Sequence, residues 1–328
     1  MKALRLHDFT GPSALRWEEV PAPAPAPGEV RVRVRATALN RADLLQTLGR
    51  YPAPPGAPAD IPGLEYAGEV LEVGERATGV KPGDRVMGLV GGGAFAEQLC
   101  VPERELLPIP TGMSFTDAAA LPEAFLTAWD ALVLQGGLKA GETVLVHAAG
   151  SGVGVAAVQV AVAAGARVIG TSRTAEKLSR LAAFGLHAGV LTGEGRDPAA
   201  DVLAATRGRG VDLVLDLVGG SAVALSLKVL APRGRMLLVG LLDGATPLVD
   251  LGLVLRKRLR LTGTVMRSRL PEEKAALAAQ AGRMLMPQFA SGALRPTVDL
   301  VLPLPRAAEG FARMAANGTF GKIVLQVD

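Results

Sequence analysis

The sequence predicts an α/β protein with a β-rich domain and a doubly wound domain of alternating strands and helices. The chain has 328 residues, which is long for one ordinary hydrophobic core. Its first third reads as short strands punctuated by glycine and proline, whereas buried strands alternate with helices beyond about residue 116. Hydrophobic residues make up 49% of the chain and charged residues 20%, a balance typical of folded globular proteins.

The first third of the chain is expected to form a barrel-like or sandwich-like β domain. Valines alternate with arginines from Val30 to Arg35, and this period of two indicates a half-buried strand with a charged outer face. Turns such as Lys81-Pro82-Gly83-Asp84 separate further short strands, which are expected over residues 67–73, 85–89 and 95–101. Many short strands with such turns are typical of this architecture.

The middle of the chain predicts a parallel sheet covered by helices on both faces. Near-continuous apolar strands are expected over residues 143–147, 167–171, 211–218, 234–240 and 258–264. Helices are expected over residues 116–120, 123–135, 152–164, 175–184 and 221–230. The pattern then changes again, with helices expected over residues 271–289 and 305–316 and a strand over residues 322–327.

Charge and cysteine content argue against several classes of protein. Lys plus Arg number 35 and Asp plus Glu 31, and the resulting net charge of +4 does not by itself indicate a nucleic-acid binder. The single cysteine, Cys100, rules out an intrachain disulfide and favours a reducing compartment. The charged start MKALRLHDF has no signal-peptide pattern and no apolar stretch is long enough to span a bilayer, so we expect a cytoplasmic protein without membrane partners.

The strongest local motif lies at the start of the predicted helix 152–164. A buried strand leads directly into Ala149-Gly150-Ser151-Gly152-Val153-Gly154. In the dinucleotide fingerprint G-x-G-x-x-G, small residues let a diphosphate approach the N–H groups at the helix start. Only the last of the three glycines is literal here, but the strand before and the helix after match the required context. We therefore expect Ser151, Gly152, Val153 and Gly154 to bind a dinucleotide; the alternative is a packing turn without a ligand.

The end of the following strand indicates which dinucleotide binds. Sites for NAD carry an Asp or Glu there, which accepts hydrogen bonds from the ribose hydroxyl groups. This chain has Ser172 and Arg173 at that point and Lys177 shortly afterwards, and these side chains can donate to a 2′-phosphate and neutralise it. The sequence therefore predicts NADPH as the cofactor. The alternative is an ordinary exposed basic turn, although cations at a helix start oppose the helix dipole.

Several segments, spread over nearly the whole chain, match one known family in the right order. They are Ala38 to Asp43, Gly49 to Tyr51, Gly63 to Glu65, Pro122 to Ala128, His147 with Ser151 to Gly154, and Gly321 to Val324. The chain resembles the zinc-free quinone oxidoreductase and ζ-crystallin branch of the medium-chain dehydrogenase/reductase superfamily, especially its p53-inducible quinone oxidoreductase subgroup. The resemblance implies a GroES-like catalytic domain, residues 1–120 and 267–328, interrupted by an inserted Rossmann domain, residues 121–266. It also implies a homodimer or homotetramer.

The residues at the zinc positions of other superfamily members differ here. Asn40 stands at the first ligand position, and Gly63-Leu64-Glu65 stands where those members have Gly-His-Glu. The few remaining candidate ligands are scattered through the chain: His7, His147, His187 and Cys100. Because these side chains cannot supply the usual tetrahedral site, we expect no metal.

Without zinc, hydride transfer is expected to rely on a hydrogen-bond donor that stabilises developing negative charge. The resemblance places the segments of Asn40 and Tyr51 at the active-site cleft, so both are candidate catalytic residues. Asn40 can instead be a helix N-cap with Asp43 at position N3, or it can serve both roles. Tyr51 can instead be a loop anchor.

The resemblance also places residues beside the cofactor, namely Asn40, Glu65, Thr127, Leu241, Val265 and Lys322. Leu241 follows a predicted strand, and ligands of doubly wound domains bind at the carboxyl ends of the strands. Thr127, Leu241 and Val265 can equally be packing residues, and Lys322 can simply cap a surface strand. His147 ends a buried strand and is expected to be structural.

These features predict a zinc-independent oxidoreductase that transfers hydride or electrons from NADPH to a quinone, a small-molecule substrate. The first alternative is an enoyl or alkenal reductase that acts on activated C=C bonds, since fold and cofactor site would look the same. The second is a weakly catalytic NADPH-binding protein with nucleic-acid affinity, for which Arg256, Lys257, Arg258 and Arg260 would supply the basic cluster. Nucleic acid is not the expected partner.

Overall fold

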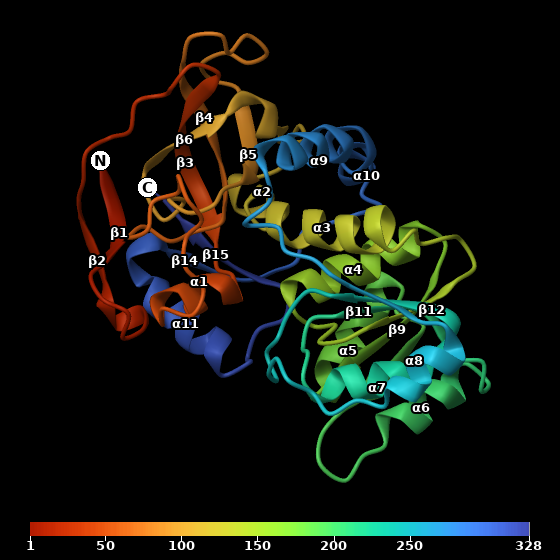
Figure 1. The fold of residues 1–328 in the computed structure, drawn as a ribbon. Helices are drawn as coiled ribbons and strands as arrows, with labels where there is room; N and C mark the ends of the chain where they lie inside the picture. The colour runs from red at the N-terminus through yellow and green to blue at the C-terminus, as the bar shows by residue number, and fades with distance from the viewer. Residues whose placement is uncertain (328) are drawn as a thin grey trace. The chain divides into compact units, whose positions relative to one another are not determined.

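A computed structural model describes residues 1–327 of the chain, which divide into two compact units (Figure 1). Unit 1 comprises Met1–Leu126 and the chain from Met266 onward, and unit 2 comprises Thr127–Val265. No helix in the described part of the chain is both long and apolar enough to cross a bilayer.

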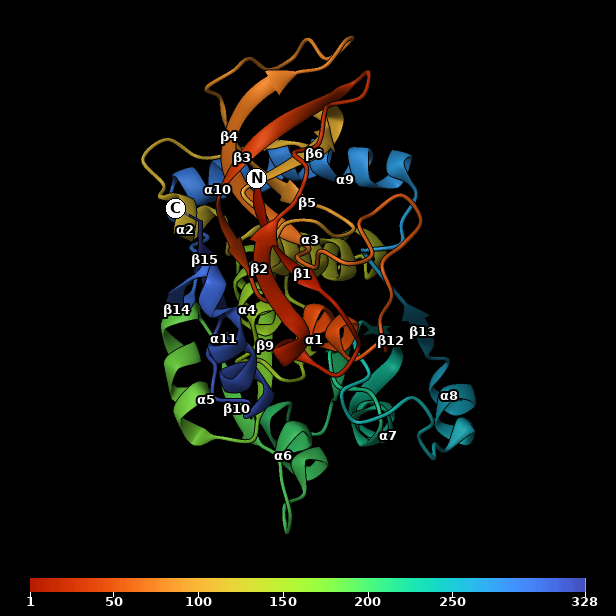
Figure 2. The same cartoon turned by 90° about the vertical axis from the view of Figure 1, so that its left-hand side faces the viewer.

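Unit 1 is built on a seven-stranded, mostly antiparallel sheet. Its strands are β3 (Glu29–Ala38), β4 (Glu65–Val73), β5 (Arg85–Leu89), β6 (Gln98–Pro102), β7 (Leu107–Pro108), β14 (Val298–Pro303) and β15 (Lys322–Gln326). They follow the order β14-β15-β3-β4-β5-β7, and β6 also pairs with β3. The strands β1 (Lys2–Leu6) and β2 (Leu15–Glu19) form a separate antiparallel pair (Figure 2). The C-terminal strands β14 and β15 thus extend the sheet that the N-terminal strands form, because β15 pairs with β3.

The alternation of valine and arginine predicts the two faces of β3 correctly. Val30, Val32 and Val34 are buried in the core of unit 1, which also contains Tyr66, Phe95 and Phe311 among others. On the other face, Arg31 pairs with Glu72 at 2.6 Å and Arg35 with Glu69 at 2.8 Å, both across to β4. Opposite charges at facing positions of antiparallel strands stabilise the pairing modestly.

The helices of unit 1 are mostly short. They are α1 (Arg41–Thr47), α2 (Phe115–Ala118), α9 (Pro271–Met284), α10 (Met286–Ala290) and α11 (Ala307–Ala315), and α3 (Pro122–Trp129) begins in this unit. The single helix expected over residues 271–289 is broken in two. Because Pro287 has no N–H group and its ring clashes with the preceding turn, α9 ends before it and α10 begins anew.

Unit 2 is a doubly wound domain with an entirely parallel sheet. Its strands are β8 (Thr143–Val146), β9 (Arg167–Ser172), β10 (Ala188–Leu191), β11 (Val211–Asp216), β12 (Leu230–Leu238) and β13 (Arg260–Gly263). The order β10-β9-β8-β11-β12-β13 means that the chain starts at the centre, winds to one edge and then returns to wind to the other. This is the Rossmann order, so the predicted fold class is confirmed.

The helices of unit 2 pack around this sheet. They are α4 (Gly152–Ala163), α5 (Ala175–Leu181), α6 (Pro198–Ala205), α7 (Ser221–Val229) and α8 (Leu251–Lys257). Three segments of this unit were not predicted, because the pattern of residues has no clear periodicity over α6, α8 and the four-residue strand β10. The helix expected over residues 123–135 is α3 followed by a π-type segment, Asp130–Gln135.

Candidate functional site

The loop after β8, residues 147–151, leads into α4 in the order of strand, turn and helix that the small-residue motif predicts, and we call this loop with the first turn of α4 the α4 cradle. Ser151 is the N-cap of α4, and its Oγ accepts a hydrogen bond from the N–H of Gly154 at 3.1 Å. The N–H groups of Gly152 and Val153, in the first turn, donate to no acceptor in the described part of the chain. Unpaired amides at a helix start attract an anion, since the helix dipole adds to their partial positive charge.

Steric constraints explain why this loop needs small residues. A Cβ added at Gly154 would lie 2.5 Å from the carbonyl oxygen of Ala148, a distance that requires the loop to move. A Cβ at Gly150 would lie 2.9 Å from Cδ of Lys177, which extends from the first turn of α5. The loop after β8 therefore lies against the Lys177 side chain.

The end of β9 presents hydroxyl and basic groups. Ser172 is buried, and its Oγ accepts from the N–H of Thr174 at 3.2 Å, which leaves its own hydroxyl hydrogen to donate. Arg173 is exposed, and no acidic residue stands at the last positions of β9. Since β8 and β9 are parallel neighbours, their carboxyl ends bring Ser172 and Arg173 to the same edge as the α4 cradle.

Thr127 is a buried hydroxyl without a partner. The residue is only 3% exposed, and its Oγ1 makes no hydrogen bond with any described residue. An unsatisfied buried hydroxyl costs about 1–3 kcal/mol, so a ligand that reaches it would remove that cost. Leu241 and Val265 are half exposed, in the segments that follow β12 and β13. Both residues, like the loop after β8, follow the carboxyl ends of parallel strands.

His147 is placed as a structural residue. Its Nδ1 lies 3.0 Å from Oγ1 of Thr171 and its Nε2 lies 2.9 Å from Oγ of Ser226, so both ring nitrogens have hydroxyl partners. Burial lowers the pKa of His147, against a weaker effect of nearby Asp216. A neutral, fully bonded imidazole at this position holds the sheet to α7.

In unit 1, Asn40 is the N-cap residue of α1, and its side chain also joins a buried polar network. Its Nδ2 donates to Glu65 Oε1 at 2.9 Å, and its Oδ1 accepts from Nζ of Lys322 at 2.6 Å. Lys322 also pairs with Glu65 Oε1 at 2.7 Å and donates to the carbonyl of Leu39 at 2.9 Å. Lys322 is therefore buried, and the alternative that it caps a surface strand is wrong.

The acidic half of the expected capping arrangement is present at α1. Asp43 Oδ2 accepts from the backbone N–H of Asn40 at 2.8 Å, and its Oδ1 accepts from the N–H of Gly63 at 3.1 Å. Burial raises the pKa of Asp43 to about 7 although these hydrogen bonds act in the opposite direction. The carboxyl group thus ties the start of α1 to the segment before β4.

Tyr51 is held in place by Arg267, a residue that no local sequence pattern marks as part of a site. Arg267 is 6% exposed, and its guanidinium lies 5.1 Å from the centre of the Tyr51 ring. It donates to the carbonyls of Tyr51 at 3.0 Å and Gly91 at 2.7 Å, and to Oε1 of Gln46 at 2.6 Å. The Tyr51 hydroxyl makes no hydrogen bond with the described residues, and burial raises its pKa, so it remains a protonated donor.

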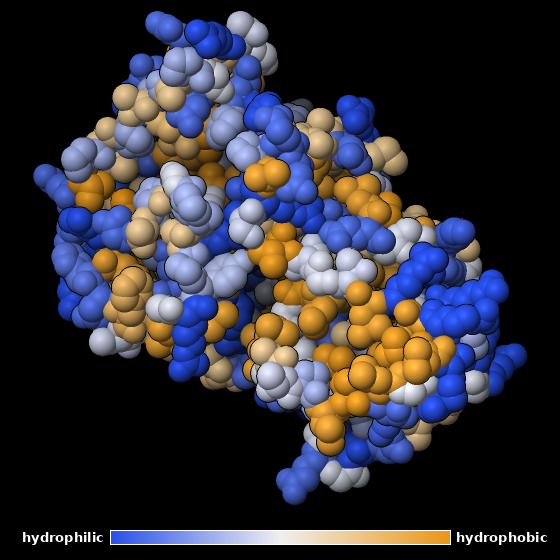
Figure 3. All heavy atoms as spheres, viewed as in Figure 1, coloured by the Kyte–Doolittle hydropathy of each residue, from blue (hydrophilic) through white to orange (hydrophobic). Residues whose placement is uncertain are grey.

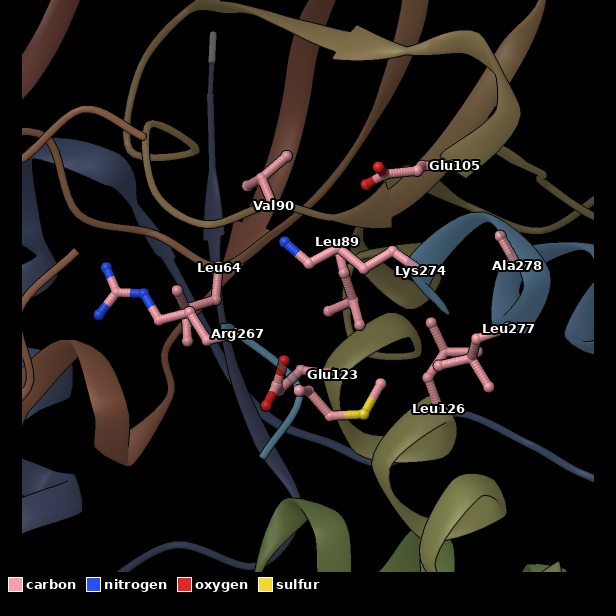
Figure 4. Close-up of a pocket in the computed structure, with 11 residues that line it drawn as sticks. Leu64, Leu89, Val90, Glu105, Glu123, Leu126, Arg267, Lys274, Leu277 and Ala278 are labelled. Carbon is pink, nitrogen blue, oxygen red and sulfur yellow. The ribbon is translucent and has the colours of Figure 1, made fainter. Parts of the chain in front are cut away.

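A pocket in unit 1 lies beside this arginine (Figure 4). Its apolar wall includes Leu64, Leu89, Val90, Leu126, Met266 and Leu277, and its polar groups are Glu105, Glu123, Arg267 and Lys274. Figure 4 shows the carboxyl group of Glu123 pointing toward the side where Leu64 and Arg267 lie. A mostly apolar cavity with a few converging polar groups is typical of a small-molecule site.

The two segments that the sequence resemblance aligns with zinc-ligand positions, at Asn40 and at Gly63 to Glu65, contain no set of metal ligands in this structure. Asn40 faces the ammonium group of Lys322, and Leu64 is buried and apolar. A positive ammonium group at hydrogen-bond distance opposes the binding of a cation. No group of three or more His, Cys, Asp or Glu side chains among residues 1–327 is arranged to hold a metal ion.

Comparisons with known families assign the chain to one superfamily. The chain matches the alcohol dehydrogenase GroES-like domain over residues 26–111 and the zinc-binding dehydrogenase family over residues 152–281. It is 34% identical to the quinone oxidoreductase-like protein 2 homolog of Nematostella vectensis, over 88% of this chain and 78% of that protein. The chain belongs to the medium-chain dehydrogenase/reductase superfamily.

The similar proteins include polyketide synthases as well as quinone oxidoreductases. The chain is 36% identical to part of the polyketide synthase GfsB of Streptomyces halstedii, over 88% of this chain but only 5% of that protein. Among solved structures, the Escherichia coli quinone oxidoreductase complexed with NADPH superposes with a TM-score of 0.89 at 30% identity, over 99% of this chain and 100% of that one.

Two more solved structures broaden the range of activities. The CurK enoyl reductase has a TM-score of 0.88 at 29% identity, over 100% of this chain and 99% of that one. An NAD-dependent alcohol dehydrogenase has a TM-score of 0.89 at 34% identity over 100% of both chains. The chain is thus an oxidoreductase of the superfamily with quinone oxidoreductase and enoyl reductase relatives.

Proposed function

We propose that the chain is an NADPH-dependent, zinc-independent oxidoreductase that reduces quinones. The observation that carries the proposal is the edge of unit 2 where β8 and β9 end. There the unpaired amides of Gly152 and Val153 would hold the diphosphate, and Ser172, Arg173 and Lys177 would hold the 2′-phosphate. The relative solved with NADPH is a quinone oxidoreductase, which supports both halves of the proposal.

Two further features of unit 2 fit a bound cofactor, namely a buried hydroxyl without a partner and two half-exposed apolar side chains. The orphaned hydroxyl of Thr127 would gain a partner from the bound cofactor, and Leu241 and Val265 would be covered by it. Asn40 and Lys322 remain proposed cofactor residues, but Asn40 donates a hydrogen bond to Glu65 and Lys322 forms an ion pair with it, so reaching the cofactor would require an exchange of partners.

The proposed chemistry divides between the cofactor and the chain. When bound, NADPH would supply a hydride, that is, two electrons and one proton. The pocket beside Arg267 would bind the ring of the acceptor against Leu64, Leu89 and Leu126. The Tyr51 hydroxyl would donate a hydrogen bond to the acceptor oxygen on which negative charge develops. Arg267 keeps this tyrosine in place through its ring and its backbone carbonyl.

Reduction of an activated C=C bond is the second candidate. The polyketide synthase relative and the CurK enoyl reductase favour it, and the same hydroxyl would polarise the carbonyl of an enone. NADPH consumption near neutral pH, measured with a panel of quinones and α,β-unsaturated carbonyls, separates the two, and NADH is the control. The proposal predicts higher kcat/KM with quinones; a higher value with enones would replace it by the second candidate.

The structure gives little support to the alternative of a weakly catalytic nucleic-acid binder, because part of its expected basic cluster already has partners within the protein. Arg256 pairs with Asp250 at 3.3 Å, and Nζ of Lys257 donates to the carbonyls of Leu227, Lys228 and Leu230. Two of the four basic side chains are therefore occupied within the protein, and fewer charges remain for phosphate contacts.

We also propose that two copies of the chain associate through unit 2. Strand β13 is an edge strand that pairs only with β12 among the described strands. Exposed leucines gather in and before α8 and on β13: Leu248 is 96% exposed, Leu255 is 78% exposed, and Leu251 and Leu261 are also exposed. Figure 3 shows hydrophobic side chains over this part of unit 2. An edge strand beside an apolar patch is a typical surface for a homodimer.

A further inference from the structure

The half-buried carboxyl group of Glu123 differs from the other acids around it. Glu65 accepts hydrogen bonds from Asn40 and from the backbone N–H of Glu123 itself, the latter at 2.8 Å, and it forms an ion pair with Lys322. Asp43 accepts from two backbone N–H groups. The carboxyl oxygens of Glu123 accept no hydrogen bond from any described residue, although the side chain lines the pocket.

The backbone fixes the position of this carboxyl group. Glu123 is the second residue of α3, and its N–H is tied to the buried carboxylate of Glu65 on β4. Its side chain projects between apolar pocket residues such as Leu64 and Leu126 (Figure 4). A rigidly placed, unbonded acid on the wall of an apolar pocket has no structural hydrogen bond to maintain, which leaves it available to a ligand.

We infer that Glu123 is the general acid that protonates the acceptor after reduction. This inference rests on the proposed reductase function and adds a residue with a distinct role to it. Tyr51 would polarise the acceptor by a hydrogen bond and keep its proton, whereas Glu123 would give its proton away.

The hydride and the proton reach the acceptor from different sources. Bound NADPH would supply a hydride to the quinone, which would leave the reduced acceptor as a hydroquinone monoanion. The O–H bond of the Glu123 carboxyl group breaks, an O–H bond forms on the negatively charged hydroquinone oxygen, and neutral hydroquinone leaves. The carboxylate of Glu123 then takes a proton from water. The net reaction consumes one NADPH, one proton and one quinone.

The surroundings of Glu123 keep its proton available near neutral pH. Burial raises its pKa to about 7, and the nearby carboxylates of Glu65 and Asp43 act in the same direction, whereas Lys322 and Arg267 oppose it. Glu105 and Lys274 line the same pocket and complete the charged groups that face it. An acid whose pKa lies near the working pH transfers protons most effectively.

The isosteric substitution Glu123→Gln tests this role, because it removes the proton without changing the shape of the pocket. We expect kcat to fall about a hundredfold, while the dissociation constant for NADPH, measured by fluorescence titration, stays unchanged. Wild-type kcat should fall as the pH rises above about 7, where Glu123 loses its proton, and the variant should lack this dependence. The matched control is Glu75→Gln, which removes an exposed carboxyl group of the same unit and should leave kcat and its pH profile unchanged.

A second measurement tests the role of Glu123 independently of the turnover rate. Infrared difference spectra recorded between about pH 5.5 and 8.5 should show a band of a titrating protonated carboxyl group that is present in the wild type and lost in Glu123→Gln, whereas the band of Asp43, whose pKa burial also raises to about 7, should persist in both. A folded Glu123→Gln variant with wild-type kcat and pH profile would overturn the inference, and so would the absence of the infrared signal. If the wild type itself oxidised NADPH with neither class of acceptor, the proposed function would fail first.

Discussion

The guanidinium group of Arg267 covers the ring of Tyr51 at 5.1 Å and binds its backbone carbonyl at 3.0 Å. The same group reaches Gln46 and Gly91, so one buried side chain connects three separate segments of unit 1. Arg267 follows directly after the residue at which the chain re-enters unit 1.

Replacing Arg267 by Met should therefore destabilise unit 1. The substitution leaves the buried acceptors on Gln46, Tyr51 and Gly91 without a donor, and we expect a loss of about 2–4 kcal/mol in the free energy of unfolding. Chemical denaturation measures this loss. Arg50→Met is the control, because it removes an exposed arginine next to Tyr51 and should change stability by less than about 0.5 kcal/mol. Equal stability of the two variants would contradict the assigned role of Arg267.

Removing the Tyr51 hydroxyl should slow turnover without weakening cofactor binding. In Tyr51→Phe the ring and the Arg267 contact remain, and only the proposed donor to the acceptor oxygen is lost. We expect kcat to fall about a hundredfold, with an unchanged dissociation constant for NADPH and an unchanged pH profile. Steady-state kinetics together with fluorescence titration provide the measurement. Full turnover in this variant would assign Tyr51 to loop anchoring instead.

The choice between NADPH and NADH should depend on Arg173. Replacing Arg173 by Asp should cost about 1.5–3 kcal/mol of phosphate contact, which raises KM for NADPH roughly 10- to 150-fold and changes KM for NADH far less. Arg180→Asp, at the other end of α5, is the matched control and should keep the wild-type preference. If the preference in Arg173→Asp stayed as in the wild type, the 2′-phosphate would have to bind elsewhere.

A methyl group at position 154 should damage the cofactor cradle. In Gly154→Ala the added Cβ would be 2.5 Å from the carbonyl oxygen of Ala148, so the loop before α4 must shift. We expect about 1–3 kcal/mol of destabilisation and weaker NADPH binding. Gly282→Ala is the control, since Cβ there would meet only Leu107 at 3.9 Å and alanine favours the helix α9. Unchanged NADPH affinity in Gly154→Ala would argue against the cradle.

The oligomeric state should respond to charge on the apolar patch of unit 2. Placing glutamate at both Leu255 and Leu261 would bury charge between two copies, and we expect a monomer by light scattering coupled to size-exclusion chromatography. Leu270→Glu, an exposed leucine of unit 1, should leave a dimer. A wild-type monomer would rule out the proposed association, whereas a tetramer would add a second contact to it.

Local sequence patterns predict much of the fold because each lies within one short segment. The alternation over Val30 to Arg35 predicts β3, and the turn of small residues ending at Gly154 predicts the start of α4. Patterns of this kind did not reveal β10 or α6, since four to eight residues carry too little periodicity.

The candidate site in unit 1 was harder to predict because its contacts join distant parts of the chain. Arg267 and Gln46 are 221 residues apart, and Glu123 and Glu65 are 58 residues apart. No local signal marks such a pair. Glu123 lay within a segment that carried the family resemblance, but only the fold revealed that its carboxyl group faces a pocket. The cofactor residues of unit 2 were easier to propose because they follow the ends of recognisable strands.

A crystal structure of the chain grown with NADPH tests the central proposal most directly. We expect the diphosphate to lie against the N–H groups of Gly152 and Val153, with the 2′-phosphate in contact with Ser172 and Arg173. A nucleotide bound at another place, or no nucleotide at saturating concentration, would contradict it.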